Sequence, residues 1–320
     1  MVFFFIKLAV GLFVLSFFFL MQAQAGIVEP IYKQLKDPTT GGQPSTVSMS
    51  ITPDGKKMFV LSHTRNKYYI YDLTTPFDLS TMDVSNRSEV DFVGDDPPSA
   101  SQIKDIEFNN DGTKVFVFGR AGTLHIHNLT TPYDVASISS STAVPDDGLN
   151  YTSAYGTVSR IHGVTFNNDG TKMYLSDGTI TSTDITQVNL STPFDPSSGT
   201  STSNLNTESI TARYTMDLAF DDDGTRLYLS ESNVGVAINY MYVWKLSNPF
   251  ELSSATYVDK WQILGNGNNL SPYAWTFGNN GMKLYIGTED ASTDGDNIIY
   301  EYDLSCPYGI VLCESETSSV

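Results

Sequence analysis

Hydrophobic and polar residues alternate along this chain in a pattern that returns at nearly constant intervals. Its most regular feature is an Asp-Gly or Asn-Gly pair, and the glycines follow one another at steps of 57, 58, 54 and 57 residues: Gly55, Gly112, Gly170, Gly224 and Gly281. Apolar residues six and four positions before each glycine predict a strand with one buried face. A short apolar run after each glycine, such as Val115-Phe116-Val117, predicts a second strand buried on both faces. The glycine then occupies a tight turn that needs positive φ.

A third strand is predicted before a proline in every repeat, because proline cannot donate to a strand ladder. The predicted third strands run from Tyr69 to Leu73, Leu124 to Leu129, Thr186 to Leu190, Met241 to Leu246 and Ile299 to Leu304. Weaker segments predict fourth strands around Val90 to Val93, Asn150 to Ala154, Ser209 to Arg213 and Trp261 to Leu264. Four antiparallel strands per repeat are typical of a β-propeller blade, whereas the coils of a parallel β-helix are shorter.

The two ends of the chain predict how the ring closes. After Pro307 only about a dozen residues remain, which leaves the fifth repeat without a fourth strand. The segment Ile31 to Leu35 precedes the first repeat at the place where such a strand belongs. The sequence therefore predicts an all-β, five-bladed β-propeller over residues 26–308, with four antiparallel strands per blade and a ring closed by the N-terminal strand.

The repeat also carries a family resemblance. Its best-preserved copy, Phe-Asn-Asn-Asp-Gly-Thr-Lys-Met-Tyr-Leu, ends at Leu175 and resembles the "SPDGxxxYV" core of lactonase-like and YVTN-type bacterial propeller repeats, which are related in pattern to WD40-like units. The likeness covers all five copies and implies the propeller fold. These families include enzymes, cell-surface proteins and scaffolds, so the resemblance assigns no activity by itself.

The first 25 residues differ in kind from the rest. Lys7 is their only charge, an apolar run extends from Leu8 to Met21, and Ala23-Gln24-Ala25 offers a small-x-small cleavage site. This pattern predicts a signal peptide over residues 1–25 and a secreted or periplasmic protein. An uncleaved membrane anchor is the alternative, although the run is shorter than the ~20 residues that a span needs.

Net charge indicates which kinds of binding partner to expect, and the cysteine content predicts a disulfide. The chain has 18 Lys and Arg against 36 Asp and Glu, a formal net charge of −18. Such a charge disfavours binding to phosphate backbones, so no nucleic-acid partner is expected. Cys306 and Cys313 are the only cysteines, and in an oxidising compartment they are expected to form a disulfide that pins the tail, residues 309–320.

The candidate binding site comes from positions that vary between otherwise regular repeats. Seven and eight residues before the turn glycines, near the start of the innermost strand, the chain places ionisable and aromatic residues. Together with arginines slightly upstream, they are expected to face the mouth of an axial channel: Lys104, Asp105, Arg160, His162, Arg213, Asp217 and Tyr273. The alternative is that these residues are only solvated strand entries.

The sequence contains two candidate metal sites. His125 and His127 have the i, i+2 spacing of two ligands on one strand face, but the same columns hold Tyr69 and Tyr71 in the first repeat, which favours packing. The loop carrying Asp290, Asp294 and Asp296 has the clustered carboxylates of a calcium site without the spacing of a known calcium loop. Calcium is therefore a possible ligand, and no other cofactor is predicted.

No catalytic signature is present: the chain lacks a Gly-x-Ser-x-Gly elbow, a His-Glu-x-x-His motif and a phosphate-binding glycine loop. The leading prediction is a non-catalytic binding or scaffolding module for a partner protein, a surface polymer or a glycan. The alternative is a polysaccharide- or lactone-active hydrolase that uses axial carboxylates or a metal. If the axial site fails, the variable loops over 176–184, 231–239 and 289–297 are the next candidates.

Overall fold

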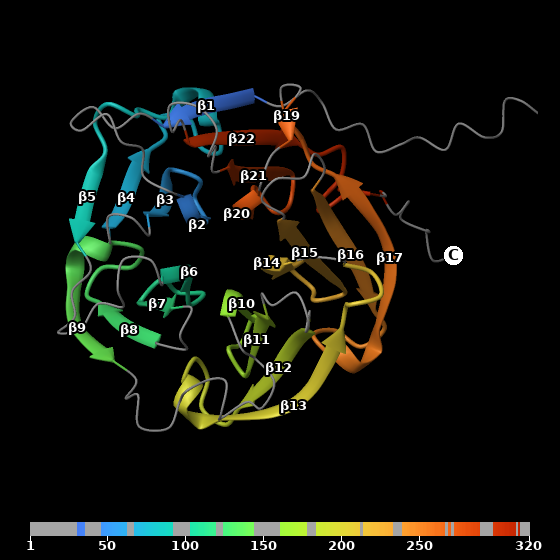
Figure 1. The fold of residues 1–320 in the computed structure, drawn as a ribbon. Coiled ribbons are helices and arrows are strands. Elements are labelled where there is room, and N and C mark those ends of the chain that lie inside the picture. Colours follow the sequence, from blue (N-terminus) through green and yellow to red (C-terminus); the bar gives the residue numbers. More distant parts are fainter. Residues whose placement is uncertain are drawn as a thin grey trace, which may run out of the picture.

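The computed structural model describes residues 31–35, 46–62, 67–91, 103–119, 124–143, 161–177, 184–211, 214–232, 239–265, 268–269, 272–288, 297–311 and 313. These residues form five four-stranded antiparallel sheets arranged as blades around a central axis (Figure 1). The first strand of each repeat lies nearest the axis, and the later strands follow outward. The prediction of five blades with four antiparallel strands each is confirmed.

The strands of the blades follow chain order, apart from one. Blade 1 holds β2 (Thr46–Ile51), β3 (Lys57–Ser62), β4 (Lys67–Asp72) and β5 (Ser88–Asp91). Blade 2 holds β6 (Ile103–Phe108), β7 (Lys114–Gly119), β8 (Leu124–Leu129) and β9 (Ile138–Ala143). Blade 3 holds β10 (Ile161–Phe166), β11 (Lys172–Asp177), β12 (Asp184–Leu190) and β13 (Gly199–Asn206). Blade 4 holds β14 (Tyr214–Phe220), β15 (Arg226–Ser232), β16 (Tyr240–Leu246) and β17 (Ala255–Gln262).

Blade 5 combines the two ends of the described chain. Its consecutive strands are β20 (Pro272–Gly278), β21 (Lys283–Thr288) and β22 (Asn297–Asp303), and its fourth strand is β1 (Ile31–Leu35). β1 pairs antiparallel with β22, with Ile31 opposite Glu301 and Leu35 opposite Asn297. A small separate hairpin, β18 (Leu264–Gly265) with β19 (Asn268–Asn269), lies between blades 4 and 5 in the sequence.

The predicted position of the fourth strands was partly wrong. β5 contains the start of the predicted segment Val90 to Val93, and β17 contains the start of Trp261 to Leu264, whereas β9 ends at Ala143 and the predicted segment Asn150 to Ala154 lies outside the described residues. In blades 1 to 4, a 3-10 turn follows the proline and the outer strand returns soon afterwards; the turns are η1 (Leu79–Thr81), η2 (Val135–Ser137), η3 (Pro196–Ser198) and η4 (Leu252–Ser254). β13 therefore ends at Asn206, before the segment from Ser209 to Arg213 that the sequence had suggested. β9 and β13 are rich in serine and threonine, so they lack the apolar alternation by which strands are recognised.

In each repeat, the turn glycine contacts the aromatic residue that follows the terminal proline, which explains why both residues recur. The residue after each proline is aromatic and has positive φ: Phe77, Tyr133, Phe194, Phe250 and Tyr308. Its ring lies over the glycine of the same repeat, which itself has φ near +70°. A Cβ atom on Gly55 would overlap the Phe77 ring, and the Phe77 N–H donates to the Gly55 carbonyl oxygen at 2.9 Å. Glycine is required there for both space and backbone conformation.

Adjacent blades are joined by apolar clusters and by tyrosine hydroxyl groups. The Tyr174 hydroxyl of blade 3 donates to the Phe250 carbonyl oxygen of blade 4 at 2.6 Å. The Tyr285 hydroxyl of blade 5 makes the equivalent bond to the Phe77 carbonyl oxygen of blade 1 at 2.7 Å. Blade 5 thus contacts blade 1 as blade 3 contacts blade 4, and the five blades form a ring (Figure 1).

The predicted disulfide is present between Cys306 and Cys313, beyond the last strand of blade 5. It encloses the aromatic residue Tyr308, whose ring covers Gly281. Within the described residues, no helix is long and apolar enough to cross a membrane. The predicted signal peptide, residues 1–25, lies outside the described residues.

Candidate functional site

The variable positions chosen from the sequence coincide with a β-bulge in each inner strand. The pairing register shifts between Ile103 and Asp105 in β6, between Ile161 and Gly163 in β10, and between Pro272 and Ala274 in β20. Lys104 and His162 are the extra residues of their strands and are half-buried. A bulge leaves one residue out of the ladder and turns its side chain, and bulges are frequent next to active sites. Because the bulge residue takes no part in the strand ladder, its identity can vary from one repeat to the next.

Asp105 ties three blades together. Its carboxylate accepts hydrogen bonds from the Ser48 hydroxyl of blade 1 at 2.6 Å and from the Val164 N–H of blade 3 at 2.7 Å. It also accepts from the N–H of Ile106, in its own strand, at 2.8 Å. The residue is only 3% exposed. Its first role is therefore to join blades, and little of its surface remains for a ligand.

Asp217 repeats this arrangement two blades further on. Its carboxylate accepts from the Leu218 N–H at 2.8 Å and from the backbone of Trp275 in blade 5. Between the two aspartates in the ring, blade 3 has Gly163, where a Cβ atom would lie 2.6 Å from the Met216 carbonyl oxygen. The glycine allows blade 4 to approach this closely, because any side chain there would collide with the β14 backbone.

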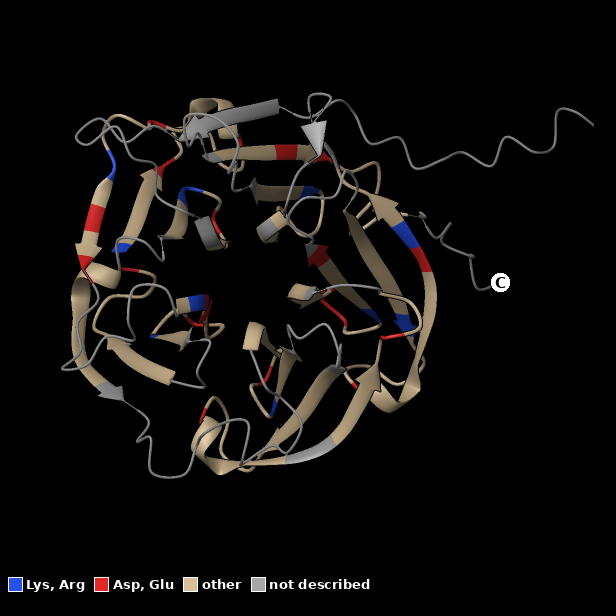
Figure 2. Ribbon diagram, viewed as in Figure 1, with Lys and Arg blue, Asp and Glu red and all other residues tan. Residues whose placement is uncertain are grey.

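Glu107 is a candidate that the sequence reasoning missed. It is half-buried on β6, two residues after Asp105 and hence on the same strand face, and it accepts a 3.3 Å hydrogen bond from the Thr165 hydroxyl. Because residues i and i+2 of a strand share a face, the position of Glu107 beside Asp105 could have been predicted from the sequence. Burial, followed by the charge of Asp105, raises the pKa of Glu107. On β6, basic and acidic residues lie together near the axis (Figure 2).

Three carboxyl groups near the axis hold their protons more tightly than usual. Burial raises the pKa of Asp105 to about 7, although the Ser48, Val164 and Ile106 hydrogen bonds oppose the shift. Burial also raises the pKa of Asp217, and the charge of Asp105 adds to it. The charge of Asp105 in blade 2 thus acts on Glu107 in the same strand and on Asp217 in blade 4.

The remaining predicted site residues are not placed. Arg160 and Arg213 lie outside the described residues, as do Asp290, Asp294 and Asp296 of the calcium candidate. Tyr273 lies at the bulge of β20, but only its backbone is described. Their roles stay predictions. Within the described part of the chain, no three His, Cys, Asp or Glu side chains are grouped closely enough to hold a metal ion.

The histidine pair is buried within blade 2. His125 and His127 are buried on β8, and their rings lie parallel with centroids 6.3 Å apart. Burial, assisted by the neighbouring His125, lowers the pKa of His127 to about 4. The pair takes the place that tyrosines occupy in blade 1, as the alignment of the repeats indicated.

A groove of about 590 Å³ lies between blades 1 and 2. We call it the blade 1–2 groove. Its apolar wall is formed by Phe59, Ile70 and Val90 of blade 1, and Tyr133 comes from blade 2. Polar and charged side chains complete the lining: Thr52, Asp54, Lys56, Lys57, Ser88, Thr131 and Asp134.

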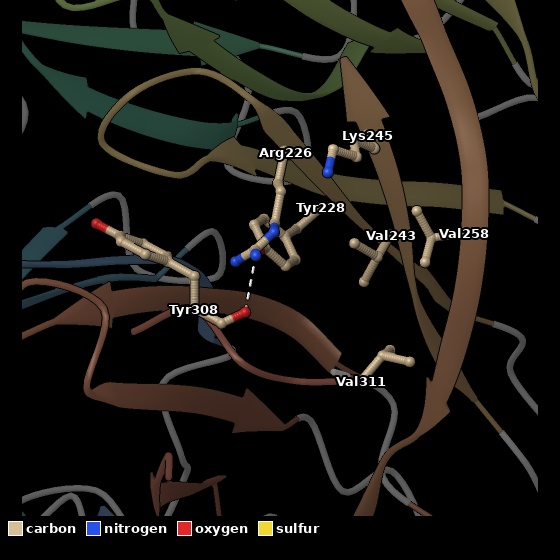
Figure 3. Close-up of a pocket in the computed structure, with 7 residues that line it drawn as sticks. All are labelled: Arg226, Tyr228, Val243, Lys245, Val258, Tyr308 and Val311. Carbon is tan, nitrogen blue, oxygen red and sulfur yellow. Dashed lines mark hydrogen bonds between the residues drawn. The ribbon is translucent and has the colours of Figure 1, made fainter. Parts of the chain in front are cut away.

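A much smaller pocket of about 50 Å³ lies at the equivalent place between blades 4 and 5 (Figure 3). Its Arg226, Tyr228 and Val243 correspond to Lys57, Phe59 and Ile70 of the blade 1–2 groove, counted from the turn glycine or the terminal proline. The two hollows therefore lie at equivalent positions between adjacent blades and differ in volume.

Solved structures similar to this chain include a β-propeller domain and a candidate lactonase. A functionally unknown protein from Desulfotomaculum acetoxidans is 14% identical with a TM-score of 0.48, over 80% of this chain and 85% of its own. A candidate 6-phosphogluconolactonase from Bacteroides fragilis is 14% identical with a TM-score of 0.41, over 77% and 67%. The Cps50 β-propeller domain from Myceliophteria thermophila is 12% identical with a TM-score of 0.38, over 80% and 69%. No protein-family model and no curated protein matches the chain.

Proposed function

We propose that this protein is an exported, non-catalytic binding module for a glycan, a surface polymer or a partner protein. The observation that carries the proposal is the blade 1–2 groove, an open hollow of about 590 Å³ on a rigid ring. Hollows of this size accommodate small ligands or single units of a polymer. The axial aspartates, by contrast, are occupied: Asp105 accepts hydrogen bonds from blades 1 and 3, and Asp217 accepts one from the backbone of blade 5.

The proposal is tested with the purified chain lacking residues 1–25. A glycan array and a thermal-shift screen with the same glycans should show retention and stabilisation without turnover of chromogenic glycosides or lactones. Turnover by this protein would overturn the non-catalytic assignment.

The hydrolase alternative rests on the three axial carboxyl groups with raised pKa, since a carboxylic acid that stays protonated near neutral pH serves as a general acid. Its test uses Asp105→Asn and Asp217→Asn. Activity lost in both folded variants would support catalysis at the axis, and activity unchanged in both would exclude these carboxylates.

Export is part of the proposal. It is supported by the apolar run and cleavage site of residues 1–25 and by the disulfide between Cys306 and Cys313, which suits an oxidising compartment. Expression of the full chain in a bacterial host, followed by N-terminal sequencing of the exported protein, should give Gly26 as the first residue. An intact N-terminus in the membrane fraction would indicate an anchor.

Closure of the ring by the N-terminal strand is a further part of the proposal. The pairing of β1 with β22 supplies a fourth strand to blade 5, and we propose that this pairing is what keeps the ring closed. It is supported by the match between the blade 5–1 and blade 3–4 contacts.

A further inference from the structure

The turn between β20 and β21 in blade 5 differs from the corresponding turns of the other four blades. In those blades an aspartate precedes the turn glycine, whereas in blade 5 Asn280 precedes Gly281. Asn279, Asn280 and Gly281 all have positive φ, of 52°, 51° and 76°, while in the other four turns only the glycine does. Two central residues with positive φ are typical of a type I′ turn, for which Asn-Gly is a favoured pair. Blade 5 therefore turns with a backbone conformation of its own.

The N–H of the turn glycine is hydrogen-bonded in blades 1 to 4. It donates to the carbonyl oxygen three residues earlier, at 2.8 to 3.1 Å: Gly55 to Thr52, Gly112 to Asn109, Gly170 to Asn167 and Gly224 to Asp221. In blade 5 the turn is closed by the Met282 N–H instead, which donates to the Asn279 carbonyl oxygen at 3.1 Å. No group in the described part of the chain accepts a hydrogen bond from the Gly281 N–H.

The side chain before the turn glycine is also held in blades 1 to 4. Each aspartate accepts a hydrogen bond from the backbone N–H two residues further on, as Asp111 does from Thr113 at 2.9 Å. Asn280 is exposed, and its side-chain amide has no hydrogen-bond partner among the described residues. The Asn280 side chain is therefore able to turn toward the backbone nitrogen of Gly281.

An asparagine followed by glycine can undergo a spontaneous intramolecular reaction. The glycine nitrogen loses its proton and attacks the asparagine Cγ; a C–N bond forms, the bond from Cγ to Nδ2 breaks, and the side-chain amide leaves as ammonia. Water then adds to one of the two carbonyl groups of the resulting succinimide and opens the ring to aspartate or to isoaspartate. Glycine favours the first step because no Cβ atom hinders the approach to its nitrogen.

We propose that Asn280 is a site of spontaneous deamidation in the folded protein, and that its isoaspartyl product loosens the contact between the blade 5 turn and the C-terminal loop. The Gly281 carbonyl oxygen accepts from the Tyr308 N–H at 2.8 Å, and the Tyr308 ring covers the glycine. The disulfide between Cys306 and Cys313 closes the loop that carries Tyr308. Isoaspartate adds a methylene group to the backbone of the turn and so displaces Gly281 from these contacts. The inference does not depend on the binding function proposed above.

Two exposed asparagines beside other turn glycines are internal controls. Asn110 and Asn168 are each followed by an aspartate, whose side chain hinders attack by its backbone nitrogen. Their side-chain amides also donate hydrogen bonds, Asn110 to the Asn168 carbonyl oxygen and Asn168 to the Asp222 carbonyl oxygen at 2.6 Å. Both should remain asparagine while Asn280 is converted.

The fold should slow the reaction only modestly. The approach of the Gly281 nitrogen to the Asn280 Cγ requires rotation of the Asn280 backbone, which breaks the turn hydrogen bond from Met282. The net contribution of one hydrogen bond corresponds to about tenfold in an equilibrium constant. With the Tyr308 contact added, the native protein should deamidate at Asn280 less than about a hundredfold more slowly than the urea-unfolded chain.

The test incubates the purified chain lacking residues 1–25 in mildly alkaline buffer, with and without urea, and follows its tryptic peptides by mass spectrometry. Fragment ions assign the replacement of amide nitrogen by oxygen to Asn280, because the same peptide also contains Asn266-Gly267, outside the described residues. We expect conversion of Asn280 in the native protein, none at Asn110 and Asn168, and loss of the reaction in Asn280→Gln. Protection of native Asn280 by more than about a hundredfold, or equal conversion at Asn110 and Asn168, would overturn the site.

The structural consequence is tested on the separated product. Ion-exchange chromatography isolates the isoaspartyl form, and its melting temperature should lie several degrees below that of the unconverted protein. Asn280→Asp adds the charge without lengthening the backbone, so it is the matched control and should melt close to the wild type. An isoaspartyl form as stable as the wild type, or an equal loss in Asn280→Asp, would overturn the loosening of the contact with Tyr308.

Discussion

At the residue scale, Asp105 combines structural use with an unusual protonation equilibrium. Its folded-state pKa of about 7 lies above the ordinary aspartate value of 3.8 because burial disfavours the charge. The folded state therefore binds more protons than the unfolded state between these two pH values. Stability falls as pH rises through this window, and the stabilisation is fully present only below about pH 4. Three pKa units correspond to about 4 kcal/mol.

Asp105→Asn should flatten this dependence, because the amide does not ionise. Urea unfolding at pH 5 and pH 8 should show the wild-type free energy of unfolding falling by an amount of the order of 1–4 kcal/mol, and the variant falling by less, because the share of Asp105 is removed while Glu107 and Asp217 keep theirs. Asp259→Asn, at an exposed position on β17, is the control and should keep the wild-type slope. An unchanged slope in Asp105→Asn would contradict the assignment.

Gly163 is the second residue on which the centre of the ring depends. Gly163→Ala places a Cβ 2.6 Å from the Met216 carbonyl oxygen, so blade 4 must shift, at a cost of about 1–3 kcal/mol. Chemical denaturation measures this loss. Gly199→Ala is the control, because its φ of −81° suits any residue; equal stability of the two variants would show that blades 3 and 4 have room to separate.

At the scale of the element, β1 is the strand whose removal is most informative. Deleting residues 27–40 removes it and leaves β22 with an unpaired edge, which is a template for aggregation. We expect a broadened unfolding transition and lower solubility, measured by differential scanning calorimetry and light scattering. Truncation after Cys313 is the control. A sharp transition at the wild-type temperature in the 27–40 deletion would contradict closure by β1.

At the scale of the whole molecule, the acidic surface opposes the compact ring. A formal net charge of −18 from 36 acidic and 18 basic residues produces self-repulsion that salt screens. The melting temperature should therefore rise when sodium chloride increases from about 0.01 M to about 0.5 M, where the Debye length is far shorter. A falling melting temperature would show that the local ion pairs, such as Lys283 with Glu301, outweigh the repulsion.

The sequence by itself determined the number of blades, the inner three strands of each blade and the turn at each glycine. These features depend on local rules, because alternation along one strand and positive φ at Gly55 are fixed by residues close in sequence. The outer strands such as β13 were misplaced, since serine and threonine give no apolar alternation.

Only the tertiary structure decided what the spaces between blades contain. Asp105 proved to be a link between blades, which required knowing that Ser48 and Val164 flank it. Ile70 and Val135 lie on different blades but in one hydrophobic core cluster, a contact that no periodicity within a strand reports. The pattern of side chains specifies each blade, whereas the packing of one blade against the next decides which polar groups are satisfied and where hollows remain.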